Sequence, residues 1–253
     1  MTSPLQTALP DLTVRHLLLP KAGHTLAECE DAFACNRTAM RFAVADGATE
    51  SFDSASWAQR LVTKWVNDSG LLTAEEFWTW LKIEGQTQND SWNRHDLPWY
   101  SMEKRRAGSF AAFVGVEIQI ERERQWKAIA LGDSCFVHSR NGTVQVVFPV
   151  SSSTDFGSAP VLAPSCAELN AHALSAIVLK SGEIVAGDRL LLLTDAIAAW
   201  YLLLCERHDD KTRSLFDDLL TGGDEAATTN FLELERSTGR LKDDDVAIVC
   251  IEF

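Results

Sequence analysis

The sequence is short of positive charge: 23 lysines and arginines stand against 36 aspartates and glutamates, a formal net charge of −13. Nucleic acids and anionic membranes both bind positively charged protein surfaces. We therefore expect neither as the main partner, although residues 104–106 form one small basic cluster.

Signals for export, membrane insertion and thiol chemistry are also missing. The first twelve residues lack a basic segment followed by an apolar one, so they do not resemble a signal peptide. The longest apolar run, 190–205, contains Asp195, which a membrane span would not carry without a reason. The six cysteines show no CxxC spacing, which predicts free, mostly buried thiols in a reducing compartment. We therefore expect a cytoplasmic protein.

What is present is an ordinary globular composition, with 46% hydrophobic and 23% charged residues over 253 positions. Apolar runs at 32–36 and 41–46 predict two neighbouring strands. Helical spacing follows in the next segment, from Trp57 to Val66, with Asp53 or Ser54 as the expected cap.

The second half of the chain is rich in predicted strands. Apolar runs follow Gly108, and Asn141-Gly142 between two of them is a strong hairpin signal. Helical patterns occupy 196–237, and a strand ends the chain. This order predicts an α+β fold with mostly antiparallel strands. No shift in composition marks a boundary, so we expect one domain over 1–253, with a tryptophan-rich helical segment at about 67–107 whose aromatic residues pack in the core.

Acidic residues recur where apolar segments begin or end. Five such segments carry one or more carboxylates: Glu30 and Asp31, Asp46, Asp133, Asp195, and Asp243 to Asp245. A buried carboxylate is costly unless it is paired or binds a cation, and few lysines or arginines lie nearby in the sequence. If these acids converge, they form an all-oxygen site suited to Mg²⁺ or Mn²⁺. Histidine and cysteine at ligand spacing, which zinc would favour, are absent.

Each acid alone has an ordinary structural explanation, because aspartate after a strand is common in turns. Asp46-Gly47 is the best example, since Asp-Gly favours a hairpin. The segment that follows has helical rather than strand periodicity, so the pair is better interpreted as opening a loop into a helix.

The order of the motifs resembles that of the metal-dependent Ser/Thr protein phosphatases of type 2C, in a divergent bacterial-type branch. The motifs are EDAF, FAVADG, GSFAAFVGV, ALGDS, LLLLTDA and DDDVAIV. The resemblance runs from about residue 24 to 253. It implies a four-layer α-β-β-α sandwich with two central antiparallel sheets and a two-metal site at one edge. It also implies hydrolysis of phosphoserine and phosphothreonine by a metal-activated water.

The resemblance assigns a role to each acid. Asp46 matches the residue that bridges both metals, and Gly47 matches a backbone-carbonyl ligand. The other matches are Asp195 and Asp244 as ligands of the second metal, Asp133 as a ligand of a third, weaker ion, Asp31 as an acid close to the pair, and Glu30 as an acid that holds water beside it. Asp243 and Asp245 are the fallbacks for Asp244.

The sequence departs from the family where substrate would bind. Many members carry an arginine shortly before the Glu-Asp pair that grips the phosphate; here Lys21 or His24 are the available substitutes. Ala48 stands where many eukaryotic members have histidine, and Thr194-Asp195-Ala196 replaces Ser-Asp-Gly.

Three functions are therefore compared. The first is a phosphatase acting on a phosphoprotein, expected to be a Ser/Thr kinase or its targets. The second is a non-catalytic regulatory or binding module with the same fold, and the third is a hydrolase of small phosphate esters.

Overall fold

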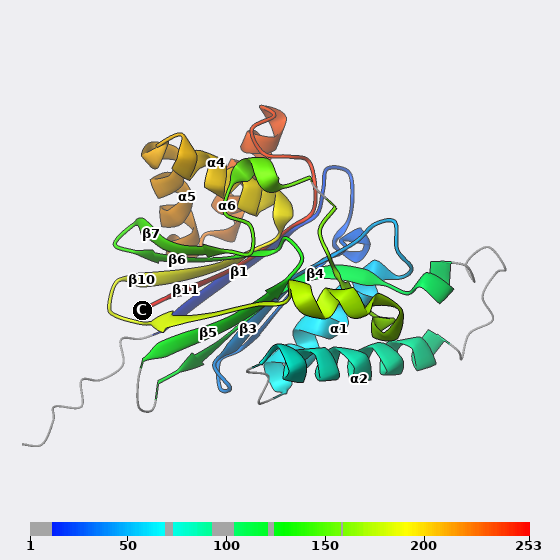
Figure 1. Cartoon of the computed structure of the whole chain (residues 1–253). Coiled ribbons are helices and arrows are strands. Elements are labelled where there is room, and N and C mark those ends of the chain that lie inside the picture. The colour runs from blue at the N-terminus through cyan, green and yellow to red at the C-terminus, as the bar shows by residue number, and fades with distance from the viewer. Residues whose placement is uncertain (1–11, 69–72, 93–103, 121–123, 158) are drawn as a thin grey trace, which may run out of the picture.

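The computed structural model describes residues 12–68, 73–92, 104–120, 124–157 and 159–253. Two antiparallel sheets lie face to face, and helices cover the outer face of each, giving four layers (Figure 1). This confirms the α-β-β-α sandwich that the family resemblance implies. The apolar core lies between the two sheets and between each sheet and its helices.

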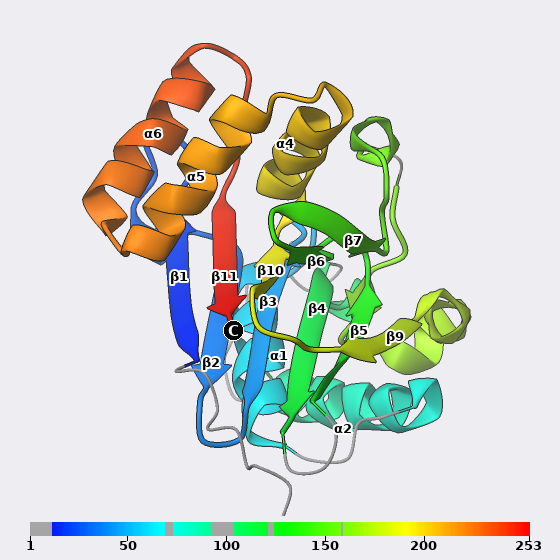
Figure 2. The ribbon, with the colours of Figure 1, turned by 90° about the vertical axis from the view of Figure 1, so that its left-hand side faces the viewer.

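The strands of each sheet come from distant parts of the sequence (Figure 2). The first sheet has the order β1 (Thr13–Leu19), β11 (Val246–Glu252), β10 (Asp188–Leu193), β6 (Cys135–Arg140) and β7 (Thr143–Phe148). The second has the order β2 (Asp31–Asn36), β3 (Arg41–Gly47), β4 (Phe110–Gln119), β5 (Gln125–Leu131) and β9 (Val178–Glu183), with the short β8 (Ala163–Pro164) beside β4. As predicted, β6 and β7 form a hairpin, and both turn residues, Asn141 and Gly142, have positive φ.

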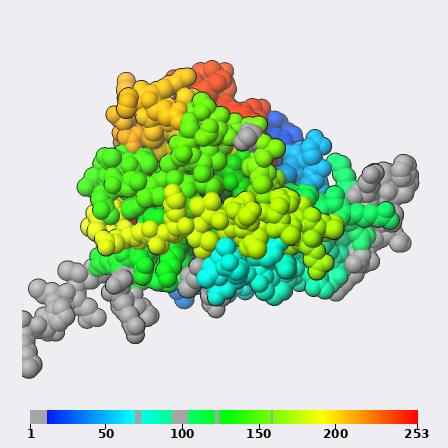
Figure 3. All heavy atoms as spheres, viewed as in Figure 1, coloured from blue at the N-terminus to red at the C-terminus, as the bar shows by residue number. Residues whose placement is uncertain are grey.

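Within the described residues, α-helices form the two outer layers, and three segments are 3₁₀. The α-helices are α1 (Ser54–Asn67), α2 (Ala74–Trp92), α4 (Asp195–Glu206), α5 (Asp210–Gly222) and α6 (Glu225–Ser237). The 3₁₀ segments are η1 (Leu26–Glu28), η2 (Ser153–Asp155) and η3 (Ala167–Ala176). Figure 3 shows η3 and β9 as a yellow-green band across one face of the molecule, where η3 packs beside α2.

Three apolar clusters join the layers. Helix α1 and helix α2 pack on the second sheet, α4 to α6 pack on the first, and a third cluster lies between the sheets. Phe113 contacts three aromatic rings in the first of these clusters: it stacks with Phe77, meets Trp65 edge-on and lies tilted against Trp80. The prediction that the aromatic residues pack in the core is confirmed for these described tryptophans.

The two helices that follow β3 begin in different ways. Thr73 and Glu76 cap α2 by exchanging hydrogen bonds with each other's backbone amide. Asp53 precedes α1 but does not cap it, because its carboxylate accepts a hydrogen bond from the Trp92 indole at 2.8 Å. Part of the tryptophan-rich segment predicted at about 67–107 lies outside the described residues; 74–92 and 104–107 of it are helical.

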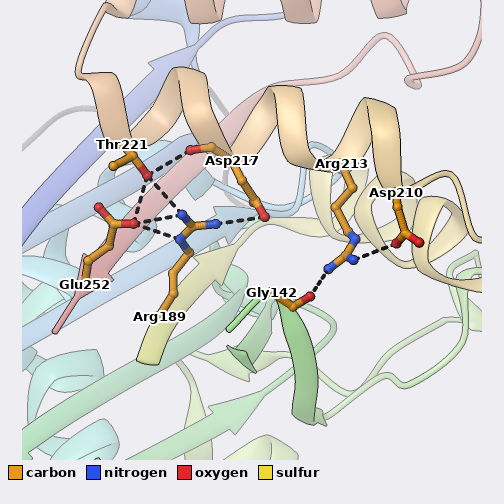
Figure 4. A network of polar contacts seen from close by, with 7 residues as sticks. All are labelled: Gly142, Arg189, Asp210, Arg213, Asp217, Thr221 and Glu252. Carbon is orange, nitrogen blue, oxygen red and sulfur yellow. Dashed lines mark hydrogen bonds and ion pairs between the residues drawn. The ribbon is translucent and has the colours of Figure 1, made fainter. Parts of the chain in front are cut away.

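A polar network fixes the outer helix α5 to the first sheet (Figure 4). Arg189 of β10 lies 2.8 Å from Asp217 of α5 and 2.8 Å from Glu252 of β11. Thr221 accepts a hydrogen bond from the same guanidinium and donates one to Glu252. The network therefore holds α5 in place with charges that sit largely out of water.

Two further predictions concern the whole chain. All six cysteines are free, and Cys29, Cys135 and Cys250 are buried while the other three are half-buried. No helix within the described ranges has the length and apolar character needed to cross a membrane.

Candidate metal centre

Asp31 and Asp46 face each other at one end of the second sheet. Strand β2 begins at Asp31, β3 ends at Gly47, and the register places Asp31 opposite Asp46. Val44 belongs to the cluster between the sheets, so Asp46, two positions later, projects into the same space. Opposite residues of an antiparallel pair have Cβ atoms roughly 5 Å apart. Two carboxyl groups thus share one region between the sheets.

The first sheet delivers two more acids to this end of the sandwich. Asp195 begins α4 just after β10, and Asp244 lies just before β11. The Thr194 amide donates to the Ala247 carbonyl at 3.2 Å, and the Ala247 amide donates to the Thr194 hydroxyl at 2.9 Å. These bonds fix the end of β10 beside the start of β11, so Asp195 and Asp244 lie on neighbouring segments.

Asp133 lies where the chain crosses from one sheet to the other. Strand β5 ends at Leu131 in the second sheet, and β6 begins at Cys135 in the first. Gly132 has a φ of 106°, and a Cβ there would come within 2.6 Å of Ala112. Glycine is therefore required for the crossover that presents Asp133 to this site.

Gly47 is required for close packing. A Cβ at this position would lie 2.8 Å from the Ser54 carbonyl and 2.9 Å from the Glu30 carbonyl oxygen. The Gly47 amide also donates to that Glu30 oxygen at 3.1 Å. The Asp-Gly pair does not form a hairpin turn, because the chain passes from β3 into the loop before α1.

Electrostatics show that the acids lie in one neighbourhood. Burial, with repulsion from Asp195 and Asp244 among the smaller causes, holds the pKa of Asp31 well above its usual range. Burial and then the charge of Asp31 raise the pKa of Asp46, and Asp195, Asp133 and Asp244 raise it further. Burial and repulsion from Asp195 raise the pKa of Asp133 to about 6. Five acids from both sheets and their crossover thus repel one another.

The three consecutive aspartates before β11 have separate positions. The Asp243 carboxylate accepts a hydrogen bond from the Ala22 amide at 2.9 Å. Asp245 accepts one from the Lys21 amide and one from the Glu30 amide, both at 2.8 Å. Asp244 Oδ1 accepts a hydrogen bond from the adjacent Asp245 amide at 3.0 Å, and its Oδ2 lies 2.7 Å from the Lys242 ammonium. Unlike its two neighbours, Asp244 makes no hydrogen bond to the 21–30 loop within the described residues, and it stays the predicted metal ligand of the three. Sequence reasoning missed the role of Asp245 in fastening the 21–30 loop.

Glu30 lies beside the centre but points to the loop after β3. Its carboxylate accepts hydrogen bonds from the Thr49 hydroxyl at 2.6 Å and the Ser54 hydroxyl at 2.5 Å. The Lys21 ammonium lies 4.0 Å from it. Glu30 therefore orders the segment that follows Asp46, and no local sequence pattern indicates these hydroxyl partners.

Lys242 is a cation that the sequence analysis overlooked. Its ammonium lies 2.7 Å from an Asp244 oxygen and 3.3 Å from an Asp195 oxygen. Among the residues described, no comparable ion pair is made by Asp31, Asp46 or Asp133. The acids of the first sheet thus have a partial counter-charge, and those of the second do not.

The ligand types, all carboxylate oxygens, suit a hard divalent cation, although the side chains are not arranged as a ligand sphere. Asp31 is 6% exposed, and its Oδ2 has no hydrogen-bond partner within the described part of the chain. A buried, unpaired carboxylate oxygen surrounded by other carboxylates is where a cation relieves most repulsion. Over the same residues, however, no three acid, histidine or cysteine side chains are arranged closely enough to hold an ion as they stand. The acids share a neighbourhood, and their side chains would have to move closer together to form a ligand sphere.

No family model and no curated protein sequence matches the chain. Solved structures do match. PppA, a key regulatory component of T6SS in Pseudomonas aeruginosa, is 15% identical, with a TM-score of 0.61 over 95% of this chain and 97% of that one. The catalytic domain of the serine threonine protein phosphatase PstP, in complex with two manganese ions, is 16% identical, with a TM-score of 0.57 over 95% and 98%.

A third match is the serine/threonine phosphatase Stp1 from Staphylococcus aureus, 13% identical with a TM-score of 0.60 over 96% of this chain and 95% of that one. The similarity extends over nearly the full length of each structure. The chain therefore has the fold of the type 2C Ser/Thr phosphatases, and the resemblance in its motifs is confirmed at the level of the fold.

Proposed function

We propose that the chain is a Mg²⁺- or Mn²⁺-dependent phosphatase that hydrolyses phosphoserine and phosphothreonine in proteins. The observation that carries the proposal is the meeting of Asp31, Asp46, Asp133, Asp195 and Asp244 at one end of a type 2C fold. The likeness to a phosphatase with two manganese ions supports the choice of metal.

In this proposal each side chain has a defined task. The charges of acids from both sheets act on Asp46, so Asp46 would be the central metal ligand, with the Gly47 carbonyl as a further one. Asp195 and Asp244 would hold the ion nearer the first sheet, Asp133 a third and weaker one, and Asp31 would neutralise and orient the pair. When bound, two divalent ions lower the pKa of a water and neutralise the phosphoryl oxygens in an in-line displacement.

The phosphate contact is assigned to Lys21 rather than His24. Lys21 lies beside Glu30, with its backbone held by Asp245, and its side chain is 24% exposed at the edge of the acids. His24 is exposed in the loop that precedes η1. A lysine ammonium attracts phosphate as a point charge but lacks the two-pronged grip of arginine, which predicts weaker substrate binding.

We further infer a phosphoprotein partner, a Ser/Thr kinase or one of its targets, in the cytoplasm. Neither nucleic acid nor a membrane is expected as a partner, given the net charge of −13.

A non-catalytic regulatory module is the second candidate. It is favoured by the lack of a ready ligand sphere in the described residues and by Lys242 among the acids. PppA, which has a similar fold, is described as a regulatory component.

The deciding experiment measures phosphate release from phosphothreonine peptides and from p-nitrophenyl phosphate, with Mn²⁺ and with chelator. We expect Mn²⁺-dependent peptide turnover that Asp46→Asn abolishes, while Asp90→Asn, a change of an exposed aspartate on α2, leaves it intact. Metal binding without turnover of any substrate would support the regulatory module, and turnover of the small ester alone would support a small-ester hydrolase.

A further inference from the structure

Lys242 pairs with the two acids that a metal would need from the first sheet. Its ammonium is 2.7 Å from Asp244 Oδ2 and 3.3 Å from Asp195 Oδ2, so one cation already bridges both carboxylates. These distances are those of charge-assisted hydrogen bonds or close ion pairs. An ammonium held at these oxygen atoms repels a divalent ion that approaches them, so the two cations compete for the same carboxylates.

The position of Lys242 allows it to leave. Its side chain is 62% exposed, against 33% for Asp244 and 21% for Asp195. A lysine has a flexible four-carbon stem and a strongly hydrated head, so moving it into solvent requires no change in the backbone. The pairing is also one-sided, because the described residues offer Asp31 and Asp46 no lysine or arginine partner.

We propose that Lys242 is an internal counter-ion that competes with the divalent cation for Asp195 and Asp244, and so sets the metal concentration at which the centre fills. The inference rests on the metal centre of the proposed function. In metal-free protein, Lys242 offsets part of the repulsion among the acids. When an ion binds, the lysine side chain has to withdraw, and its positive charge remains close enough to oppose the ion.

The test compares Mn²⁺ binding, measured by calorimetry on chelator-treated protein, for the wild type and three variants. Lys242→Met keeps most of the stem and removes the charge, and Lys242→Arg keeps the charge. Lys211→Met removes the charge of an exposed lysine on α5 and is the matched control. The unfolding temperature of each metal-free protein is measured alongside.

For Lys242→Met we expect about a tenfold lower Kd at low ionic strength, with a smaller gap at high salt, because the lost repulsion is electrostatic and partly screened. Lys242→Arg stays within about threefold of the wild type, and Lys211→Met has no effect. Metal-free Lys242→Met unfolds at a lower temperature, since its acids lose their counter-charge. Mn²⁺ binding by Lys242→Met alone, and not by the wild type, also supports the proposal.

An unchanged or higher Kd for Lys242→Met overturns the proposal, as does an absence of Mn²⁺ binding by every variant. Failure of the proposed phosphatase function has a different signature: Mn²⁺ binds and Lys242→Met binds it more tightly, yet no phosphorylated substrate turns over. The binding measurement is thus independent of activity.

Discussion

Replacing Asp133 with asparagine is expected to stabilise the metal-free protein. Burial and the charge of Asp195 raise the pKa of Asp133 to about 6, whereas an unfolded aspartate titrates near 4. A carboxyl group with a raised folded-state pKa loses stability as the pH rises from the unfolded to the folded value. At pH 7.5, above both pKa values, the wild type carries the full loss of stability. Asparagine has no ionisable group, so the variant avoids this loss.

The size of the effect follows from the shift. Two pKa units correspond to roughly 3 kcal/mol, and because Asp133 is half-buried, screening by water reduces this to about 1–2 kcal/mol. Urea unfolding in chelator, from pH 4 to 7.5, measures it. We expect Asp133→Asn to gain stability at pH 7.5 and to lose that gain near pH 4.

The control is Asp90→Asn, an exposed aspartate on α2, which should change the free energy of unfolding by less than about 0.5 kcal/mol. With saturating Mn²⁺, the advantage of Asp133→Asn should shrink or reverse, because the carboxylate then faces a cation. A variant that is no more stable than the wild type at pH 7.5 in chelator, or equally stabilised at pH 4, refutes the picture of mutually repelling acids.

Two further predictions concern the frame around the centre, and urea unfolding reports both. Gly47→Ala should lower the free energy of unfolding by about 1–3 kcal/mol, because the added Cβ meets the Ser54 and Glu30 backbones. Gly222→Ala is the control, because the space around that glycine is open. Equal effects of the two changes would contradict the packing argument. Arg189→Met should lower the free energy of unfolding by about 2–3 kcal/mol, because it leaves two largely buried carboxylates without their cation. The control is Arg207→Met, a change of an exposed arginine. A loss no larger than that of the control would mean that the network does little for stability.

Much of the fold could be predicted because its signals are local. Alternating or continuous apolar runs indicated β2, β3 and the β6–β7 hairpin, and helical spacing indicated α1. The acids could be singled out because each lies at the end of such a run. Their order along the chain supported one fold, which the solved structures of that fold confirm.

The parts that could not be predicted depend on contacts between residues far apart in the sequence. Asp245 holds the amide of Lys21, 224 positions away, and Lys242 reaches Asp195, 47 positions away. No local pattern distinguishes Asp244 from its two neighbours, since the difference lies in which backbone amides happen to meet them. Asp53 likewise has the sequence of a helix cap, yet it binds Trp92 instead.

The most direct test of the central claim is the rate of phosphate release from one phosphothreonine peptide as Mn²⁺ is added back to chelator-treated protein. The account predicts that the rate rises with Mn²⁺ in the wild type and in Asp90→Asn, and stays at background in Asp46→Asn. Turnover that persists in chelator, or that survives Asp46→Asn at saturating Mn²⁺, would contradict a mechanism built on this acidic centre.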